Sequence, residues 1–438
     1  MSGRTIRDHR TPPANTAPIA REPAVTRPTR YTPRKHDRRR SEIVELATGE
    51  LNEHGVRGLV MADVAAKAGM TKANLNYYFR RKEDLAAHCF DVAIEVYRDL
   101  IAAAAVEPVP DGRVRALVER YFERSRAALA GEAPPLAILS DIRALDDDYQ
   151  ARAVARYSEM LHETAALLTP DAQDEMAIYR NIPRAQMLLV QLFWSAAWIS
   201  HYEPGDIPQV AQRLGDVIAG GIAPSGFAWR DDWGAEARAI AAEDHAGSER
   251  AEFFRAATGL INRLGYRGAS VDRIAAAMNQ TKGAVYHHHV SKDELLEACF
   301  DRTFKQMWGM IRHAGELAAG PLHRIGLIAA ALVAYQTGDR GPLLRDTALT
   351  SLPMGQRQDV LAEMNRITLH LAAIVTDGIA AGEIRPVDPL LAAQFLIAGV
   401  NAAEEINRFV PSGLVSDVAE LCIPPLLSGI FVGRTNRR

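Results

Sequence analysis

Two short segments, TKANLNYY and TKGAVYHH, concentrate lysine, amide and aromatic side chains without any acidic residue. Lysine can reach phosphate oxygens or guanine acceptors, and an asparagine side chain offers the paired donor and acceptor that match adenine. Tyrosine and histidine can donate to phosphates or pack on sugars and thymine methyl groups. With the next lysine along the chain, the first set is Thr71, Lys72, Asn74, Asn76, Tyr77, Tyr78 and Lys82. The second set is Thr281, Lys282, Gly283, Tyr286, His287, His288 and Lys292.

Some of these residues also allow interpretations other than DNA contact. The run 287–289 of three histidines suggests a metal site, but adjacent residues on a helix point about 100° apart and cannot converge on one ion. We therefore predict no metal and no cofactor. Asn74 can be either a base contact or a solvated helix residue, and both readings stay open. The apolar residues in and after the two segments are expected in the core: Leu75, Phe79, Val285 and Leu295.

Both segments belong to an internal repeat. Residues 38–91 align with 248–301 without a gap, and 18 of the 54 aligned pairs are identical. Identity at this level over a gap-free span is far above chance. The chain therefore consists of two similar modules, and each begins with a domain that carries one of the two segments.

The pattern around each segment predicts a helix-turn-helix. A helical pattern ends at Gly55, a second short helix follows, and Gly69 supplies the positive φ of a tight turn. Thr71 can then cap a third helix. In the second copy Ser270 can cap the second helix, where the first copy has Val60, which cannot. In such a unit the third helix would enter the major groove of DNA.

The stretches VAAKAGMTKANLNYYFRRKEDL (64–85) and IAAAMNQTKGAVYHHHVSKDEL (274–295) resemble the DNA-binding signature of the TetR/AcrR family of bacterial regulators. The first copy resembles the pyrimidine-utilisation repressor subgroup most. The resemblance implies a sequence-specific transcriptional regulator that binds a double-stranded operator. It also implies a repressor that a small apolar or aromatic ligand releases.

The second copy departs from the family pattern at two positions. Asn279 stands at the turn glycine and His289 at the core phenylalanine. These departures leave an alternative open, in which only the first copy reads DNA and the second serves as a degenerate interaction or dimerisation module.

The expected fold is all-α, with two tandem helix-turn-helix domains that are each followed by a helical ligand-binding and dimerisation bundle. Pro, Gly and Asp clusters divide the bundles into amphipathic helices. The expected boundaries are a disordered basic arm at 1–35, DNA-binding domains at 36–96 and 248–306, bundles at 97–226 and 307–438, and a linker at 227–247.

The resemblance implies that the last two long helices of each bundle pair with a partner in a four-helix interface. The candidates are residues 180–202 with 208–219, and residues 389–409 with 415–431. A chain with two modules can form this interface internally, so we predict a monomeric pseudo-dimer, with a homodimer as the alternative. Candidates for contact with a small-molecule effector are Phe193, Trp194, Trp198 and Trp308, although an aromatic residue on a helix is more often simply part of the core.

The basic residues are concentrated at the N-terminus. Residues 1–40 hold eleven Lys and Arg against three acids, a net charge of +8, while the remaining residues carry −11. Six prolines and few large apolar residues predict a flexible arm. The arm can reach along DNA phosphates or be a solvated tail with no specific target, and both readings stay open.

Composition excludes other classes of protein. A net charge of −3 excludes a uniformly basic, histone-like protein, and three scattered cysteines favour a reducing bacterial cytoplasm over a disulfide framework. Apolar runs fall short of the roughly 18–20 residues that span a bilayer, so we expect no membrane partner. The usual hydrolase, zinc-protease and P-loop motifs are absent, so we do not expect an enzyme.

Overall fold

The computed structural model is entirely helical in the residues that it describes, which confirms the predicted all-α class. The chain divides into two units between Arg39 and Arg40, and the packing described below is that of the second, Arg40–Arg438. Among the described helices, none combines the length and hydropathy needed to cross a bilayer. The described residues are 35–171, 173–243, 251–278, 292–345, 348–349, 352, 354–409 and 418–431.

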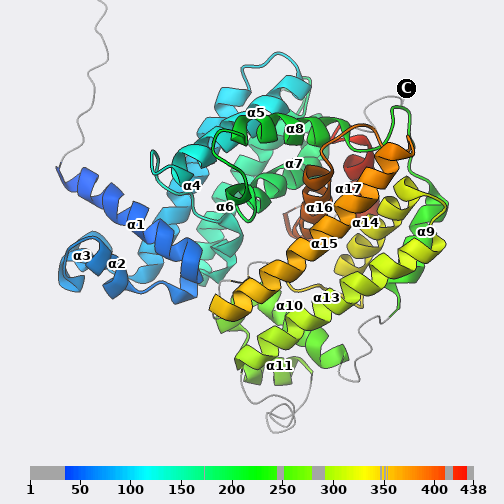
Figure 1. The fold of residues 1–438 in the computed structure, drawn as a ribbon. Coiled ribbons are helices and arrows are strands. Elements are labelled where there is room, and N and C mark those ends of the chain that lie inside the picture. The colour runs from blue at the N-terminus through cyan, green and yellow to red at the C-terminus, as the bar shows by residue number, and fades with distance from the viewer. Residues whose placement is uncertain are drawn as a thin grey trace, which may run out of the picture. The chain divides into compact units, whose positions relative to one another are not determined.

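The first module begins with four helices, drawn from blue to cyan in Figure 1. They are α1 (Lys35–Gly58), α2 (Met61–Lys67), α3 (Lys72–Tyr78) and α4 (Lys82–Ala104). Helix α1 is interrupted at Gly55, where φ is 67° and ψ is 170°, as the sequence predicts. Gly265 has nearly the same angles, φ 70° and ψ 164°, in α10 (Ala251–Gly268), so the two repeats break their first helix in the same way.

The first bundle follows α4 in the chain. It comprises α5 (Pro110–Leu129), the 3₁₀ turn η1 (Leu139–Ala144), α6 (Asp147–Leu167), α7 (Glu175–Ser195), the 3₁₀ turn η2 (Ile199–His201) and α8 (Ile207–Gly220). Helix α4 packs against both α5 and α6, and α5 packs against α8. Because α4 begins within the predicted helix-turn-helix domain (36–96), one continuous helix connects that region to the bundle.

The segment 227–247, expected to be a linker, contains helix α9 (Asp231–Ala241). This helix packs against α14 (Pro321–Thr337) of the second module. The Trp233 ring stacks on His323 with 4.3 Å between centroids. A Cβ on Gly326 would lie only 3.3 Å from atoms of the Trp229 and Trp233 rings. The tryptophans therefore attach the connecting segment to the second bundle.

The second module repeats the order of the first. After α10 come α11 (Val271–Ala277), α13 (Lys292–Leu317), α14, α15 (Met354–Ala380), α16 (Pro389–Phe409) and α17 (Val418–Ser428). The cap difference predicted from the sequence is confirmed: the Ser270 Oγ accepts from the Arg273 N–H at 3.3 Å, whereas Val60 makes no side-chain cap bond to α2. The second recognition segment, 281–288, lies outside the described residues.

The bundles of the two modules contact each other within the chain. Helix α16 packs against α7 and α8, and α17 packs against α7. The Gln191 side chain donates to the Phe395 carbonyl at 2.8 Å, and the Trp194 ring N–H donates to Gln394 at 2.8 Å. These four helices overlap the ranges that the sequence singled out for a four-helix interface.

The ends of α8 and α17 approach each other backbone to backbone. The N–H groups of Ile222 and Ala223 both donate to the Leu427 carbonyl, at 2.8 and 2.7 Å. Two glycines with positive φ, Gly221 (68°) and Gly429 (89°), lie at this crossing. A Cβ on Gly221 would lie 2.2 Å from the Leu427 carbonyl oxygen, so only glycine fits without displacement of the backbone.

Candidate nucleic-acid interface

Helix α3 presents one exposed side and one buried side. Its first N–H groups are capped by Thr71, whose hydroxyl accepts from the Asn74 N–H at 3.2 Å. Leu75 is fully buried and Phe79, just after the helix, is 3% exposed, which confirms their predicted core positions. The exposed residues on and beside the helix include the predicted contacts Thr71, Lys72, Asn74, Asn76 and Tyr77.

The remaining predicted contacts of the first copy differ in their surroundings. Tyr77 is 76% exposed, whereas Tyr78 is half-buried and packs on the core, with its ring edge-on to Tyr77 at 5.4 Å. The Lys82 ammonium donates to the Arg57 carbonyl at 3.3 Å. Tyr77 therefore lies on the exposed side of α3, while Tyr78 and Lys82 also hold α3 and α4 in place.

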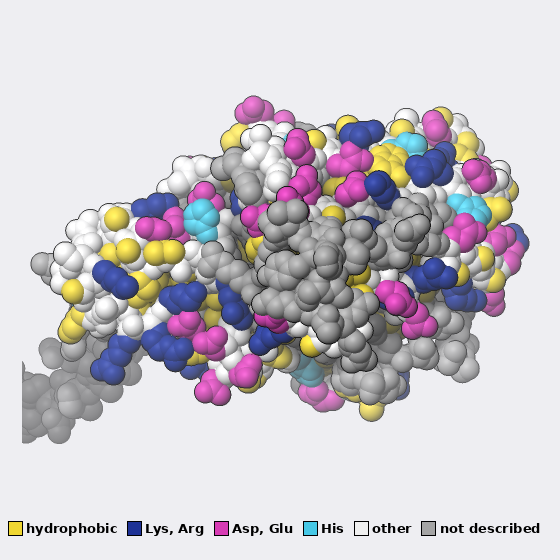
Figure 2. Space-filling view, turned by 90° about the horizontal axis from the view of Figure 1, so that it is seen from below, with side chains coloured by type: hydrophobic (Ala, Val, Ile, Leu, Met, Phe, Trp, Pro, Cys, Tyr) yellow, Lys and Arg dark blue, Asp and Glu magenta, His cyan; other side chains and the backbone are white. Residues whose placement is uncertain are grey.

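Basic residues surround this helix. Figure 2 shows Lys and Arg side chains over α1–α4, at the left of the view, interspersed with acidic and apolar ones. Arg81 is held by Asp146 at 3.2 Å, while the neighbouring Arg80 is exposed in the turn between α3 and α4. Arg80 was missed as a candidate phosphate contact, although the basic run 80–82 signals it.

Of the second copy's candidates, six lie outside the described residues: Thr281, Lys282, Gly283, Tyr286, His287 and His288. Lys292 is the first residue of α13. On either side of these residues the core follows the first copy, because Ile274 and Leu295 are buried like their counterparts Val64 and Leu85. The predicted core position of Leu295 is thereby confirmed.

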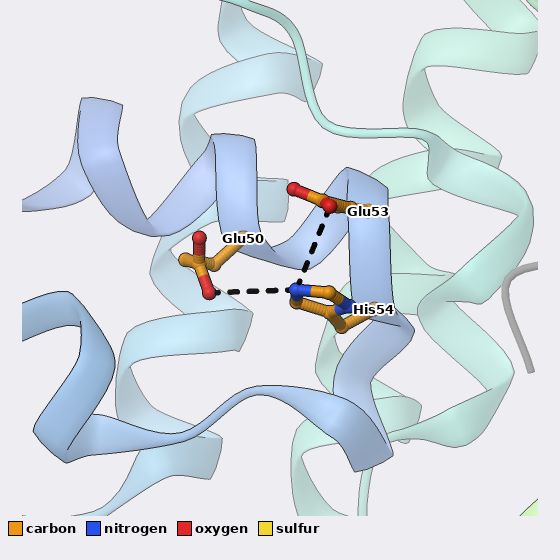
Figure 3. Close-up of side chains that lie close together, drawn as sticks. All are labelled: Glu50, Glu53 and His54. Atoms are coloured by element: carbon orange, nitrogen blue, oxygen red, sulfur yellow. Dashed lines mark ion pairs between the residues drawn. The ribbon is translucent and has the colours of Figure 1, made fainter. Parts of the chain in front are cut away.

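One cluster near α3 has metal-ligating residue types. Glu50, Glu53 and His54 lie on α1, and the His54 Nε2 is 3.8 Å from Glu50 and 3.9 Å from Glu53 (Figure 3). Glu50 is 4% exposed and also forms an ion pair with Lys67 at the end of α2. The Glu50 carboxylate raises the pKa of Lys67 through this hydrogen bond. The cluster therefore already has a cation, and the pair joins α1 to α2.

The second copy tests the role of this pair, because Leu260 and Ala277 occupy the positions of Glu50 and Lys67. We expect Lys67→Ala to lower the melting temperature of the first domain, since it leaves the Glu50 carboxylate buried without its ammonium. The double variant Glu50→Leu/Lys67→Ala should recover most of the loss. Thermal unfolding by circular dichroism measures both, and a double variant no more stable than Lys67→Ala would contradict this role.

Two cavities lie where the bundles meet, and Trp194 and Asn401 line both of them. The larger, ≈ 220 Å³, is lined by Phe193 and by residues of both modules, including Arg345. The smaller, ≈ 60 Å³, has a mostly apolar lining from the second bundle. Of the other effector candidates, Trp198 lines a third pocket, and Trp308 donates to Glu363 at 2.6 Å.

Buried titratable groups surround the larger cavity. Burial lowers the pKa of the Arg143 guanidinium and raises that of the Tyr157 hydroxyl. Glu404, beside the cavity, has a raised pKa, again because of burial. These charged groups are shielded from water, so the stability of their charged forms depends on the charged and hydrogen-bonding partners around them.

Comparisons with known proteins agree with this geometry. The family model described as "Bacterial regulatory proteins, tetR family" matches residues 43–89 and again 253–299. The HTH-type transcriptional regulator YhgD of Bacillus subtilis (strain 168), described as uncharacterised, is 26% identical over 140 residues, 32% of this chain and 73% of that protein. The HTH-type transcriptional regulator BetI of Brucella suis (strain ATCC 23445 / NCTC 10510) is 24% identical over 177 residues, 40% of this chain and 86% of that protein.

Among solved structures, that of apo AibR matches with a TM-score of 0.35 and 24% identity, over 41% of this chain and 98% of that one. The regulators YhgD and BetI are each matched over most of their own length by less than half of this chain. One relative therefore corresponds to about one of the two modules.

Proposed function

Since this chain is a TetR-family transcriptional regulator with two copies of the family's DNA-binding domain, we propose that it binds an operator as an intramolecular pseudo-dimer. Both recognition helices would insert into one DNA duplex. A DNA-binding dimer of this kind places its recognition helices about one helical turn, roughly 34–36 Å, apart. Here one chain would supply both.

The packing of α7 and α8 against α16 and α17 within one chain carries this proposal. A four-helix contact of this kind covers, within one chain, the surface that a single module would otherwise bury against a second chain. The buried side chains of Gln191 (2% exposed) and Trp194 (7% exposed) donate hydrogen bonds to residues of the other module. Such a contact leaves little reason for an obligate partner.

The two half-sites should differ in sequence. Asn74 and Asn76 of the first copy correspond to Ala284 and Tyr286 of the second. Because the amides that suit adenine are missing from the second copy, its preferred bases must differ. We therefore propose a non-palindromic or degenerate operator.

We expect the purified chain to elute in size-exclusion chromatography with light scattering at the mass of one chain, 48.0 kDa. With a duplex carrying both half-sites, it should form a 1:1 complex. Sedimentation or light scattering of the complex measures this stoichiometry. An obligate dimer of twice the chain mass that occupies four half-sites would show the pseudo-dimer to be wrong.

The alternative, a degenerate second copy, rests on Asn279 and His289. Footprinting with Lys72→Ala and, separately, with Lys282→Ala distinguishes the two functions. Two reading copies predict loss of protection over a different half-site for each variant. A degenerate second copy predicts that only Lys72→Ala reduces protection of the DNA.

The effector and the mode of regulation are further parts of the proposal. A repressor released by a small apolar or aromatic ligand is supported by the two cavities that meet at Trp194. The pyrimidine-utilisation subgroup rests on the recognition stretch of the first copy alone. We place the protein at the chromosome in a bacterial cytoplasm, where an operator is found, with the basic arm at 1–35 as an additional phosphate contact.

A further inference from the structure

Asn52, on α1, hydrogen-bonds an extended segment of the first bundle. Its side-chain amide donates to the Leu136 carbonyl at 2.8 Å, and its oxygen accepts from the Ile138 N–H at 3.0 Å. The amide thus satisfies a carbonyl and an N–H two residues apart, as a neighbouring strand would. This bond pair connects the first DNA-binding domain to the segment that leads into η1.

Asn262, the counterpart of Asn52 in the repeat, makes the same pair of bonds. Its amide donates to the Leu343 carbonyl at 2.9 Å and its oxygen accepts from the Arg345 N–H at 3.1 Å. Two asparagines 210 residues apart therefore hold two equivalent segments with the same atoms. We call each of these pairs of hydrogen bonds an asparagine clamp. One clamp connects each DNA-binding domain to its bundle.

Both clamped segments lead to one carboxylate. Arg143, at the end of the first segment, forms an ion pair with Glu405 of α16, and Arg345, in the second segment, forms an ion pair with the other oxygen of the same Glu405. The three side chains are only 7–10% exposed. The carboxylate of one residue thus joins elements of both modules.

A buried cluster of charged side chains such as Arg143, Glu405 and Arg345 has a well-defined geometry. Carboxylate–guanidinium bonds are directional and short, and burial removes the water that would otherwise compete for them. Loss of the carboxylate would leave two guanidinium groups close together in a site with little water. The cluster therefore favours one relative position of the two clamped segments over others.

We propose that Glu405 is the positioning residue that sets the relative placement of the two DNA-binding domains, through Arg143 and Asn52 on one side and Arg345 and Asn262 on the other. The inference rests on the proposed function, because it matters only where both domains bind one duplex. Glu405 itself is far from α3 in the sequence and belongs to the bundle. Its effect on DNA binding would come through the two arginines.

Glu404 provides the matched control. It is adjacent to Glu405 and its carboxylate is 3.8 Å from the Arg345 Nε, but its hydrogen bond, at 3.1 Å, is to Gln336 of its own module. Glu404→Gln removes an equal charge from the same turn without removing the connection to Arg143. Glu405→Gln removes the connection and keeps the size of the side chain.

The test measures the affinity of the full chain for three duplexes. The first is a duplex selected from a random library by the wild-type protein, the second has one half-site scrambled, and the third has five base pairs inserted between the half-sites, which turns one half-site by about half a helical turn. Wild type should prefer the first duplex over the others by about 5–150-fold, the usual range of coupling between two sites. Glu404→Gln should keep that preference.

Glu405→Gln should lose most of the preference for correct spacing, while its affinity for the duplex with one half-site changes by less than about threefold. If this variant melts before the measurement, Arg143→Gln, which cuts only the connection to the first module, should show the same loss. Folded variants that keep the wild-type spacing preference overturn the inference alone. A wild-type protein that binds all three duplexes equally overturns the proposed function, and the inference with it.

Discussion

Replacing Lys72 or Asn74 by alanine is expected to weaken operator binding by about 1–3 kcal/mol each, roughly 5–150-fold, without loss of stability. Both side chains are on the exposed side of α3, and the Asn74 backbone N–H, not its side chain, makes the Thr71 cap bond. The two variants should differ in kind. Lys72→Ala should reduce the salt dependence of binding, whereas Asn74→Ala should relax the preference for one base.

Titration of labelled duplexes at several salt concentrations measures both effects, and thermal unfolding shows whether the variants stay folded. Lys305→Ala is the control, because it removes another exposed lysine, one that pairs with Asp301 on α13. Asn74→Ala has a natural precedent, since the second copy has Ala284 at that position. Wild-type affinity and base preference in Asn74→Ala would assign this residue to the solvated face of the helix.

Gly221→Ala is expected to destabilise the chain strongly, although it adds only one methyl group. The new Cβ would lie 2.2 Å from the Leu427 carbonyl oxygen and 2.4 Å from the Gly429 nitrogen, and both of these are backbone atoms that cannot rotate away. A positive φ costs a residue with a side chain about 1–2 kcal/mol, and overpacking adds roughly 1–3 kcal/mol. Because the crossing joins the two modules, preference for two half-sites should fall as well.

Gly226→Ala separates the two contributions. Gly226 has a comparable φ of 84°, but among the described residues no atom beyond its chain neighbours lies within 4 Å of the Cβ that alanine would add. It should therefore show only the smaller, conformational loss of stability. Urea unfolding of both variants gives the comparison. Equal losses in Gly221→Ala and Gly226→Ala would mean that the backbone contact between α8 and α17 contributes little to holding the modules together.

Local features of the DNA-binding domains were predictable from neighbouring residues. Thr71 caps α3, Gly69 takes a positive φ of 63° in the turn, and Ser270 caps α11 where Val60 cannot cap α2. Each depends on bonds between residues a few positions apart. Capping and turn preferences are short-range, so a sequence pattern is enough to identify them.

The exposed and buried sides of α3 were predictable for a similar reason. Helical spacing separates Leu75 and Phe79 from the residues that face solvent. Tyr78 is the exception, since it is half-buried against the core while its neighbour Tyr77 is 76% exposed. The family motif contains an aromatic block there, and only packing decides which ring faces out.

Contacts between distant residues were not predictable in this way. The stretch around Trp229 and Trp233 is polar enough to suggest a linker. Its rings nevertheless pack on a surface of α14 that no local sequence pattern predicts. The identical Asn52 and Asn262 were visible in the repeat, but their partners, Leu136 and Leu343, are more than eighty residues away. Nothing in a single sequence connects an amide to a particular distant carbonyl.

By itself, the sequence determined that this protein has two helix-turn-helix copies and that the remainder, where the structure describes it, is helical. Which residues of each copy contact DNA stays a prediction. These properties follow from short-range preferences and from the period of the helix. Tertiary structure alone decided that Gln191 of α7 bonds the Phe395 carbonyl of α16, that two glycines let α8 and α17 touch, and that Arg143 and Arg345 share Glu405. Those choices depend on the fit of surfaces far apart in the chain, and only the folded arrangement selects which of the many compatible apolar and charged groups meet.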